Sequence, residues 1–172
     1  MSTKRKKERK AVDAFQLLKA DHKSVKELFK TFEKTSSDSK RQSAAALALQ
    51  ALRVHAAIEE EIFYPALRSV FKEGDLLDEA QEEHRVAKTL IEDLASGQAE
   101  FFEAKFTVLA ENVRHHIREE ENEMFPRAKK KRLDFDAMGE AMRSRKDQLL
   151  ADERVLRKAE QASKVQPFQK KR

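Results

Sequence analysis

One phrase of histidine and glutamate occurs twice in the chain, in a register of 61 residues. The copies begin at His55 and His116, and each reads His-x-x-x-Glu-Glu with a proline five residues after the second glutamate. A histidine and a glutamate four residues apart project from one face of a helix, with Cβ atoms about 5–6 Å apart. His55 and Glu59, and likewise His116 and Glu120, are therefore close enough to bind one metal ion.

Another histidine precedes each phrase at nearly the same distance. His22 lies 33 residues before His55, and His84 lies 32 residues before His116. The unit His…His-x-x-x-Glu thus occurs twice, which is what a metal centre inside a four-helix bundle needs.

The types of these side chains narrow the choice of metal. Imidazole and carboxylate without sulfur suit iron, manganese or zinc. Six ligands exceed what a structural zinc accepts, and they are enough for two metal ions bridged by carboxylates. The Glu-x-x-His pattern of ferritin-like sites and the His-Glu-x-x-His pattern of zinc proteases are both absent from the sequence.

Turn-forming residues divide the chain into helical segments that could position the site. Breakers at 35–39, 73–75 and 96–97 leave segments of roughly 11–34, 41–72, 76–95 and 99–131, with only three glycines and three prolines in the whole chain. Each segment carries an apolar stripe at alternating three- and four-residue steps. The stripes are Phe15, Leu18, His22, Val25, Phe29, Phe32; Ala48, Leu52, His55, Glu59, Ile62, Ala66; Leu77, Ala80, His84, Ala87, Ile91, Leu94; and Phe102, Phe106, Leu109, Val113, His116, Glu120, Met124.

The only polar members of these stripes are the four histidines and two glutamates. A carboxylate buried without a partner costs several kcal/mol or takes up a proton, and a metal cation removes that cost. Each hairpin also brings its two histidines to one height, about 24 Å from the turn at about 1.5 Å per residue. The two hairpins are therefore expected to be related by pseudo-twofold symmetry, with their ligands converging at mid-bundle.

The pattern resembles the hemerythrin-like HHE cation-binding domain family over about residues 11–130. The residues that carry the resemblance are His22, His55-x-x-x-Glu59, His84 and His116-x-x-x-Glu120, with the trailing Pro65 and Pro126. The resemblance implies an all-α fold, an antiparallel up-down-up-down four-helix bundle holding an oxo- or hydroxo-bridged non-haem centre of two iron ions. It implies that the four histidines are terminal ligands and that Glu59 and Glu120 bridge the ions, with zinc or manganese as alternative metals.

One departure from oxygen-carrying hemerythrins concerns a fifth histidine, which those proteins have one helical turn from the histidine on the third helix. The positions four before and four after His84 are Ala80 and Lys88 here. The missing ligand favours a reactive centre or a sensor over simple oxygen carriage.

Several other residues lie close to the predicted ligands in the sequence. His115 is interpreted as a boundary residue, with a fifth ligand or proton donor as the alternative. Glu60, Glu119 and Glu121 are expected to be solvated or to orient histidine N–H groups. Tyr64 lies about 180° round a regular helix from His55, so it is expected to pack rather than to bind metal. Pro65 and Pro126 are expected to bend both ligand helices one turn beyond the site.

The ends of the chain differ from its body in charge. A basic tail at 1–10, the run 129–132 and the end at 170–172 are rich in lysine and arginine, and the remainder holds 23 basic and 30 acidic residues. We expect a bundle at 11–131, an additional helix within 132–163 and a basic C-terminal tail at 164–172. The additional helix has an apolar pattern and could pack outside the bundle or form an interaction surface: Phe135, Met138, Met142, Leu149, Leu156. The tails could contact nucleic acid or anionic lipid, or serve only as solvated ends.

The sequence favours a cytoplasmic protein, because it has no cysteine, no secretory signal and no membrane-spanning run. The leading hypothesis is a non-haem di-iron protein that binds or reacts with O2, NO or H2O2 in sensing, storage or stress response. The alternatives are a catalase-like enzyme that decomposes peroxide and a non-catalytic, iron-responsive interaction module. The oligomeric state stays open.

Overall fold

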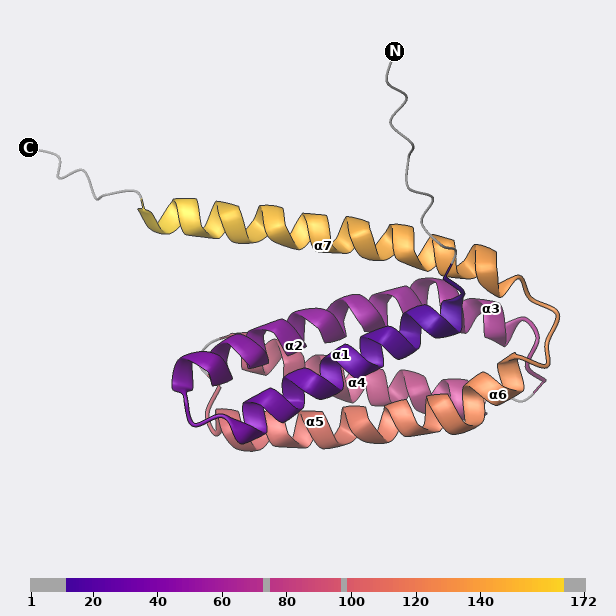
Figure 1. Ribbon diagram of the computed structural model, residues 1–172, viewed down its shortest axis with the longest axis horizontal. Coiled ribbons are helices and arrows are strands. Elements are labelled where there is room, and N and C mark those ends of the chain that lie inside the picture. The colour runs from indigo at the N-terminus through magenta and orange to yellow at the C-terminus, as the bar shows by residue number, and fades with distance from the viewer. Residues whose placement is uncertain (1–11, 73–74, 97–98, 166–172) are drawn as a thin grey trace, which may run out of the picture.

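The computed structural model describes residues 12–72, 75–96 and 99–165, and all regular structure in these ranges is helical. The elements are α1 (Ala14–Lys34), α2 (Asp38–Ile58), η1 (Glu59–Phe63), α3 (Tyr64–Arg68), α4 (Asp75–Ala95), α5 (Phe102–Glu119), η2 (Glu120–Met124), α6 (Phe125–Ala128) and α7 (Phe135–Val165), where η1 and η2 are π-helical turns. The segment η1–α3 continues α2, and η2–α6 continues α5, so the chain forms four long rods and a fifth helix (Figure 1).

The four rods form the antiparallel bundle that the sequence predicts. Helix α1 packs mainly on α2, and α4 packs mainly on α5. Side-chain caps begin the first hairpin: Asp13 accepts from the backbone N–H of Gln16 at 2.8 Å, and Ser37 accepts from that of Lys40 at 3.4 Å. Such caps satisfy N–H groups that the first turn leaves unpaired.

Two apolar clusters fill the bundle, one at each end. One is centred on residues such as Phe15, Phe63 and Leu67, and the other on residues such as Phe29 and Phe106. The predicted polar residues lie between these clusters, which keeps the layer at mid-bundle out of water.

The apolar stripe of the second segment was predicted wrongly beyond Glu59. The structure leaves Ile62 and Ala66 only partly buried and instead buries Phe63 and Leu67 completely. In η1 the backbone N–H of Tyr64 donates to the carbonyl oxygen of Glu59, five residues back. A π turn inserts one extra residue, so every later side chain is displaced by one position from the α-helical expectation.

The two prolines lie just after these π turns. Pro65 and Pro126 each occupy the first turn of the short helix that follows η1 or η2. The second π turn closes with a bond from the N–H of Phe125 to the carbonyl of Glu120. Both irregular turns therefore begin at the two predicted bridging glutamates.

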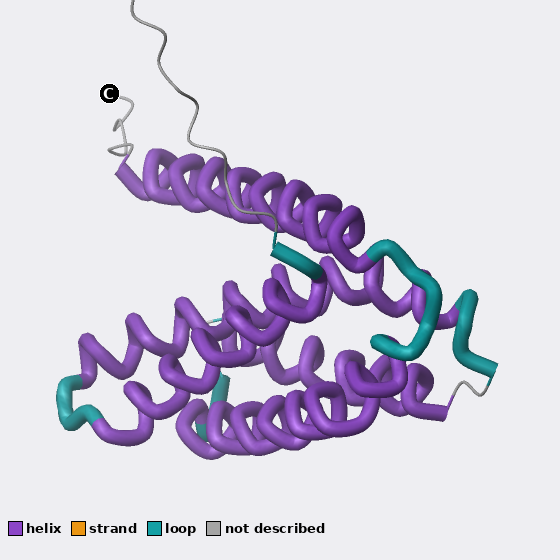
Figure 2. The backbone as a smooth tube through the Cα atoms, turned by 45° about the vertical axis from the view of Figure 1, so that its right-hand side comes forward, coloured by secondary structure: helices purple, strands orange, loops and turns teal. Residues whose placement is uncertain are grey.

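Helix α7 packs across the outside of the bundle, against α1, α2 and η1 (Figure 2). Met138 and Met142 of its predicted stripe are buried, and Phe135 and Leu149 are partly buried. Leu156 lies outside the residues whose side chains are described. Gly139 permits the close approach, because a Cβ there would lie 2.2 Å from the carbonyl oxygen of Val12.

The helices in the described ranges include none that is long and apolar enough to cross a membrane. The basic segments at 1–10 and 170–172 lie outside the described residues. Within the run 129–132, the ammonium groups of Lys129 and Lys131 lie over the rings of Phe15 and Phe71, at 5.1 and 5.7 Å from the centroids. These two lysines therefore contribute to packing at this end of the bundle.

Candidate metal centre

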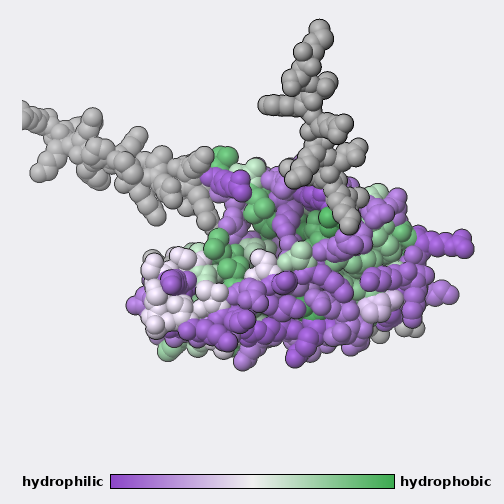
Figure 3. All heavy atoms as spheres, in the orientation of Figure 1, coloured by the Kyte–Doolittle hydropathy of each residue, from purple (hydrophilic) through white to green (hydrophobic). Residues whose placement is uncertain are grey.

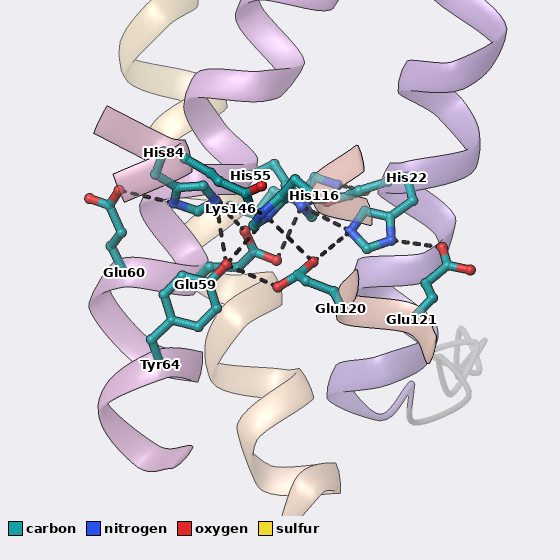
Figure 4. A network of polar contacts seen from close by, with 12 residues as sticks. His22, His55, Glu59, Glu60, Tyr64, His84, His116, Glu120, Glu121 and Lys146 are labelled. Atoms are coloured by element: carbon teal, nitrogen blue, oxygen red, sulfur yellow. Dashed lines mark hydrogen bonds and ion pairs between the residues drawn. The ribbon is translucent and has the colours of Figure 1, made fainter. Parts of the chain in front are cut away.

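The six predicted ligands form one buried layer, to which each rod contributes (Figure 4). His22 comes from α1, His84 from α4, and the remaining four from the two repeated phrases. None of the six is more than 6% exposed: His22, His55, Glu59, His84, His116, Glu120. The sequence thus predicted both the face and the height of these residues.

The donor atoms divide into two overlapping groups. Atoms of His22, His55, Glu59 and Glu120 lie within 4.8 Å of one another, and so do atoms of Glu59, His84 and His116. One Glu59 oxygen lies 3.1 Å from His55 Nε2, and the other lies 3.3 Å from His84 Nε2. Glu59 therefore spans the two groups, as a bridging carboxylate would.

Glu120 also approaches both histidine pairs, but with a single oxygen. Its Oε2 lies 3.2 Å from His22 Nε2 and 3.7 Å from His116 Nε2. The Nε2 atoms also face each other in pairs, 3.1 Å apart for His22 and His55 and 3.2 Å apart for His84 and His116. Each pair thus directs two nitrogen donors at one small volume.

The buried carboxylate oxygens fit a cationic occupant. Both side-chain oxygens of Glu59 and Oε2 of Glu120 are buried without a hydrogen-bond partner among the described residues. Leaving such anionic atoms without a donor is costly. Cations between the carboxylates and the imidazoles would satisfy them, and the mixed nitrogen and oxygen set suits iron, manganese or zinc.

The outer ring nitrogens (Nδ1) of two predicted ligands contact acidic residues that the sequence had suggested for this task. Glu121 lies 2.8 Å from His22 Nδ1, and Glu60 lies 3.0 Å from His84 Nδ1. Figure 4 shows these two glutamates on opposite outer sides of the layer. An acceptor at Nδ1 fixes the proton there, so that the lone pair of Nε2 points into the site.

The other two outer nitrogens contact acidic residues that the sequence reasoning missed. Glu83 lies 2.7 Å from Nδ1 of His116, and Asp21 lies 3.6 Å from Nδ1 of His55. Asp21 directly precedes His22, and Glu83 directly precedes His84. An acidic residue thus directly precedes the first histidine of each repeated unit, and this repetition could have identified both residues from the sequence.

Tyr64 faces the site, contrary to the prediction that it packs on the opposite side of the helix. Its hydroxyl donates to Glu120 Oε1 at 2.9 Å and lies 3.4 Å from Nε2 of both His84 and His116. The π turn η1 explains the error, because the extra residue displaces Tyr64 by one position, or about 100°.

His115 and Glu119 lie outside the layer. The side chain of His115 is 52% exposed, and its Nε2 pairs with Glu119 at 3.0 Å. His115 is thus a surface residue, as its position one step off the stripe suggested. Glu119 does not orient any of the four buried histidines.

The carboxylates favour the protonated form of two imidazoles of the metal-free layer, those of His55 and His84. Burial lowers the pKa of His55, but the charge of Glu59 and contacts with Asp21 and Glu59 outweigh it and raise the pKa to about 10. For His84, burial is outweighed by Glu59 and Glu60, and the pKa rises to about 9. Without metal, protons thus balance the carboxylates, and a metal ion must displace them because an imidazolium cannot coordinate.

The Tyr64 phenol keeps its proton in this surrounding. Burial raises its pKa well above the ordinary value, and the negative charges of Glu120 and Glu59 raise it further. The carboxyl of Glu59 has a pKa well below its usual range, since the attraction of His55 and His84 exceeds the effect of burial.

A small cavity adjoins the layer. It has a volume of about 30 Å³, and the four histidines line it together with apolar side chains that include Val25, Leu52, Ile91, Val113 and Ile117. A volume of about 10–15 Å³ on this measure holds one water molecule. The cavity can therefore admit a molecule the size of O2, NO or H2O2 beside the four histidines.

Comparisons with known proteins agree with this architecture. A model of the hemerythrin HHE cation-binding domain matches residues 13–128. The DNA nickase of Nostoc sp. (strain PCC 7120 / SAG 25.82 / UTEX 2576) is 32% identical over 111 residues, which are 63% of this chain but only 31% of that protein. The chain thus spans less than a third of the length of this relative.

A solved structure extends the comparison to the fold. The crystal structure of a hemerythrin HHE cation-binding domain-containing protein, the Rv2633c homolog from Mycobacterium kansasii, matches with a TM-score of 0.68 and 28% identity. The match covers 82% of this chain and 89% of that one. The chain belongs to the hemerythrin HHE cation-binding domain family.

Proposed function

We propose that this chain is a non-haem di-iron protein that binds or reacts with O2, NO or H2O2. The observation that carries the proposal is the position of Glu59, with one oxygen at each of the two histidine pairs. His22 and His55 would hold one ion, and His84 and His116 the other. Glu59 and Glu120 would bridge them, since each reaches imidazoles of both pairs.

The surrounding acids prepare the histidines to act as ligands. Glu60, Glu83 and Glu121 lie 2.7–3.0 Å from Nδ1 atoms, where they accept the ring proton. Each imidazole then presents an unprotonated Nε2 to the ion, and its ring orientation is fixed. Lys88 donates to both oxygens of Glu60 at 2.8 and 2.9 Å, which holds that carboxylate behind His84.

The small molecule would enter the cavity beside the four histidines. Bound iron supplies the coordination and redox chemistry that these side chains lack. The apolar part of the lining, which includes Val25, Leu52 and Ile91, would limit water near bound ions. At the other side of the layer, Tyr64 holds Glu120 in place and carries a proton that a reacting oxygen could receive.

This proposal is tested by loading the purified chain with Fe2+ in the presence and absence of air. We expect two iron ions per chain and a near-ultraviolet absorption band of a bridged ferric pair after oxidation. The matched variant Glu59→Gln retains the size of the side chain but removes its charge, and it should lose at least one ion. Uptake of a single zinc ion, with no ferric band after aerobic iron loading, would contradict the di-iron assignment.

Peroxide decomposition is the second candidate, and the Tyr64 hydroxyl is the observation that favours it. This phenol lies 3.4 Å from two of the predicted ligand nitrogens and keeps its proton in the buried layer. A proton donor so close to the ions could serve the cleavage of an O–O bond. Steady-state evolution of O2 from H2O2 would distinguish an enzyme from a binding protein or sensor.

A further inference from the structure

A lysine of the outer helix reaches the carboxylate behind one predicted ligand. Lys146 of α7 forms an ion pair with Oδ1 of Asp21 on α1. The other oxygen, Oδ2, faces His55 Nδ1 at 3.6 Å. The contact thus joins α7 to the metal layer through a single side chain.

Both atoms of the inner contact are buried. Asp21 Oδ2 and His55 Nδ1 have no hydrogen-bond partner among the described residues. The Asp21 side chain is 14% exposed and that of Lys146 is 28% exposed. The ion pair with Lys146 therefore holds the Asp21 carboxylate in place beside His55.

The ion pair between Asp21 and Lys146 lies at the edge of a cleft. Asp21 and Lys146 line a cleft of about 320 Å³ between α1, α2 and α7, together with Leu28, Val54 and Leu150 among others. Figure 3 shows apolar surface gathered along this side of the bundle. Without Lys146, the Asp21 carboxylate could turn toward water in the cleft and move away from His55 Nδ1, which lies 3.6 Å from it.

The other half of the bundle lacks this arrangement. Glu83, which corresponds to Asp21, lies 2.7 Å from His116 Nδ1, and its second neighbour is the surface residue His115 at 3.7 Å. Helix α7 packs on α1, α2 and η1. The extra helix thus acts on the half of the site that contains His22 and His55.

We propose that Lys146 is a positioning residue for the metal centre, which fixes His55 through Asp21. The inference rests on the proposed metal-binding function. It gives α7 a role in the metal site. It predicts that loss of the Lys146 contact lowers the affinity of the metal position at His22 and His55 and leaves the other position unchanged. Lys146 contacts no predicted ligand directly, so its effect must pass through Asp21.

The test compares Fe2+ affinity in the unchanged chain, in four variants, and in the Asp21→Asn chain that is the reference for the fourth. Lys146→Met should weaken binding of one of the two ions by about tenfold or more, in line with losses seen for residues that support metal ligands. Lys146→Arg should restore most of the affinity, because it keeps the charge. Arg145→Met is the matched control: Arg145 also ties α7 to the bundle, through Glu61 at 2.6 and 3.0 Å, but Asp21 is not its partner. This control should bind both ions like the unchanged chain.

The fourth variant carries Lys146→Met in an Asp21→Asn background. There the lysine substitution should have no further effect on affinity. The proposal would be overturned if Lys146→Met and Arg145→Met lost equal affinity for Fe2+. It would also be overturned if Lys146→Met still lowered the affinity in the Asp21→Asn background. Either result would indicate that Lys146 acts only by docking α7 on the bundle. If the unchanged chain takes up no iron, the proposed di-iron function fails. The same series titrated with Co2+ then tests the positioning of His55 independently of iron.

Discussion

The hydroxyl of Tyr64 donates to Glu120 across the bundle, whereas the equivalent residue of the second phrase, Phe125, stacks against the ring of His22. The Tyr64–Glu120 bond measures 2.9 Å, and the rings of Phe125 and His22 are 6.0 Å apart at an angle of 7°. The two phrases are alike in their ligands but differ at this position. Of these two equivalent residues, only Tyr64 offers a proton to the layer.

Tyr64→Phe removes this donor without removing the ring. The metal-free protein should lose about 1–3 kcal/mol of unfolding free energy, because a buried carboxylate oxygen of Glu120 loses its hydrogen bond. Urea unfolding at neutral pH measures the change. If the loaded variant also reacts with H2O2 as fast as the unchanged chain, Tyr64 has no part in proton transfer.

Three adjacent glutamates should give graded losses of metal. Glu59→Gln should abolish binding of at least one ion, because both of its oxygens face predicted ligands. Glu60→Gln should weaken binding by about tenfold, since it loses the charge behind His84. Glu61→Gln is the control, because Glu61 is 44% exposed and pairs with Arg145 at the surface. Isothermal titration with Fe2+ gives the three affinities, and equal losses would mean that the helical faces are assigned wrongly.

The pH dependence of stability should differ between the metal-free and loaded forms. The pKa of His55 is raised to about 10 and that of His84 to about 9, above the ordinary value of 6.5. A histidine whose pKa is higher in the folded than in the unfolded chain stabilises the fold fully at pH values below its unfolded pKa. This stabilisation is lost as the pH rises through the pKa of the folded state. The free energy of unfolding of the metal-free protein should therefore fall between about pH 7 and 10.

Loaded protein should not show this decline, because metal ions have displaced the ring protons. Urea unfolding at pH 7, 8, 9 and 10, with and without iron, makes the comparison. A flat profile for the metal-free form would mean that the histidines are uncharged there.

Metal should also raise the melting temperature at neutral pH. A ligand that binds only the folded state stabilises it by mass action, by about 2.7 kcal/mol at a free concentration of 100 times Kd. Differential scanning calorimetry of the chain with and without Fe2+ tests this. Equal midpoints, in protein shown to be loaded, would place the ions outside the bundle core.

The sequence predicted the six candidate ligands because they obey helical periodicity up to Glu59 and Glu120. Beyond these residues the same periodicity failed at Tyr64, Ile62 and Ala66, since a π turn has no signature in an apolar stripe. The prolines indicated an irregularity after each phrase but not its form. The effect on function is large, because the inserted residue directs the only tyrosine of the chain into the site.

Asp21 was missed for a different reason. One acidic residue beside a histidine is common on a charged helix, and 39% of this chain is charged. Whether such a residue contacts a neighbouring helix depends on the packing angle, which the periodicity does not encode. The role of Lys146 was even harder to predict from the sequence, because the prediction requires knowing which face of the bundle α7 covers.

Gly139→Ala provides a test of how closely α7 must approach α1. Alanine favours a helix by about 1 kcal/mol over glycine, so an unpacked α7 would be stabilised. In the packed helix the new Cβ would lie 2.2 Å from the carbonyl oxygen of Val12 and 2.8 Å from the backbone nitrogen of Ala14, which forces the two helices apart. We therefore expect faster hydrogen exchange in α7 and a lower melting temperature. The control is Ser144→Ala, at an exposed position of the same helix, which should change neither the hydrogen exchange nor the melting temperature. A higher melting temperature for Gly139→Ala would mean that α7 does not pack on α1 at this distance.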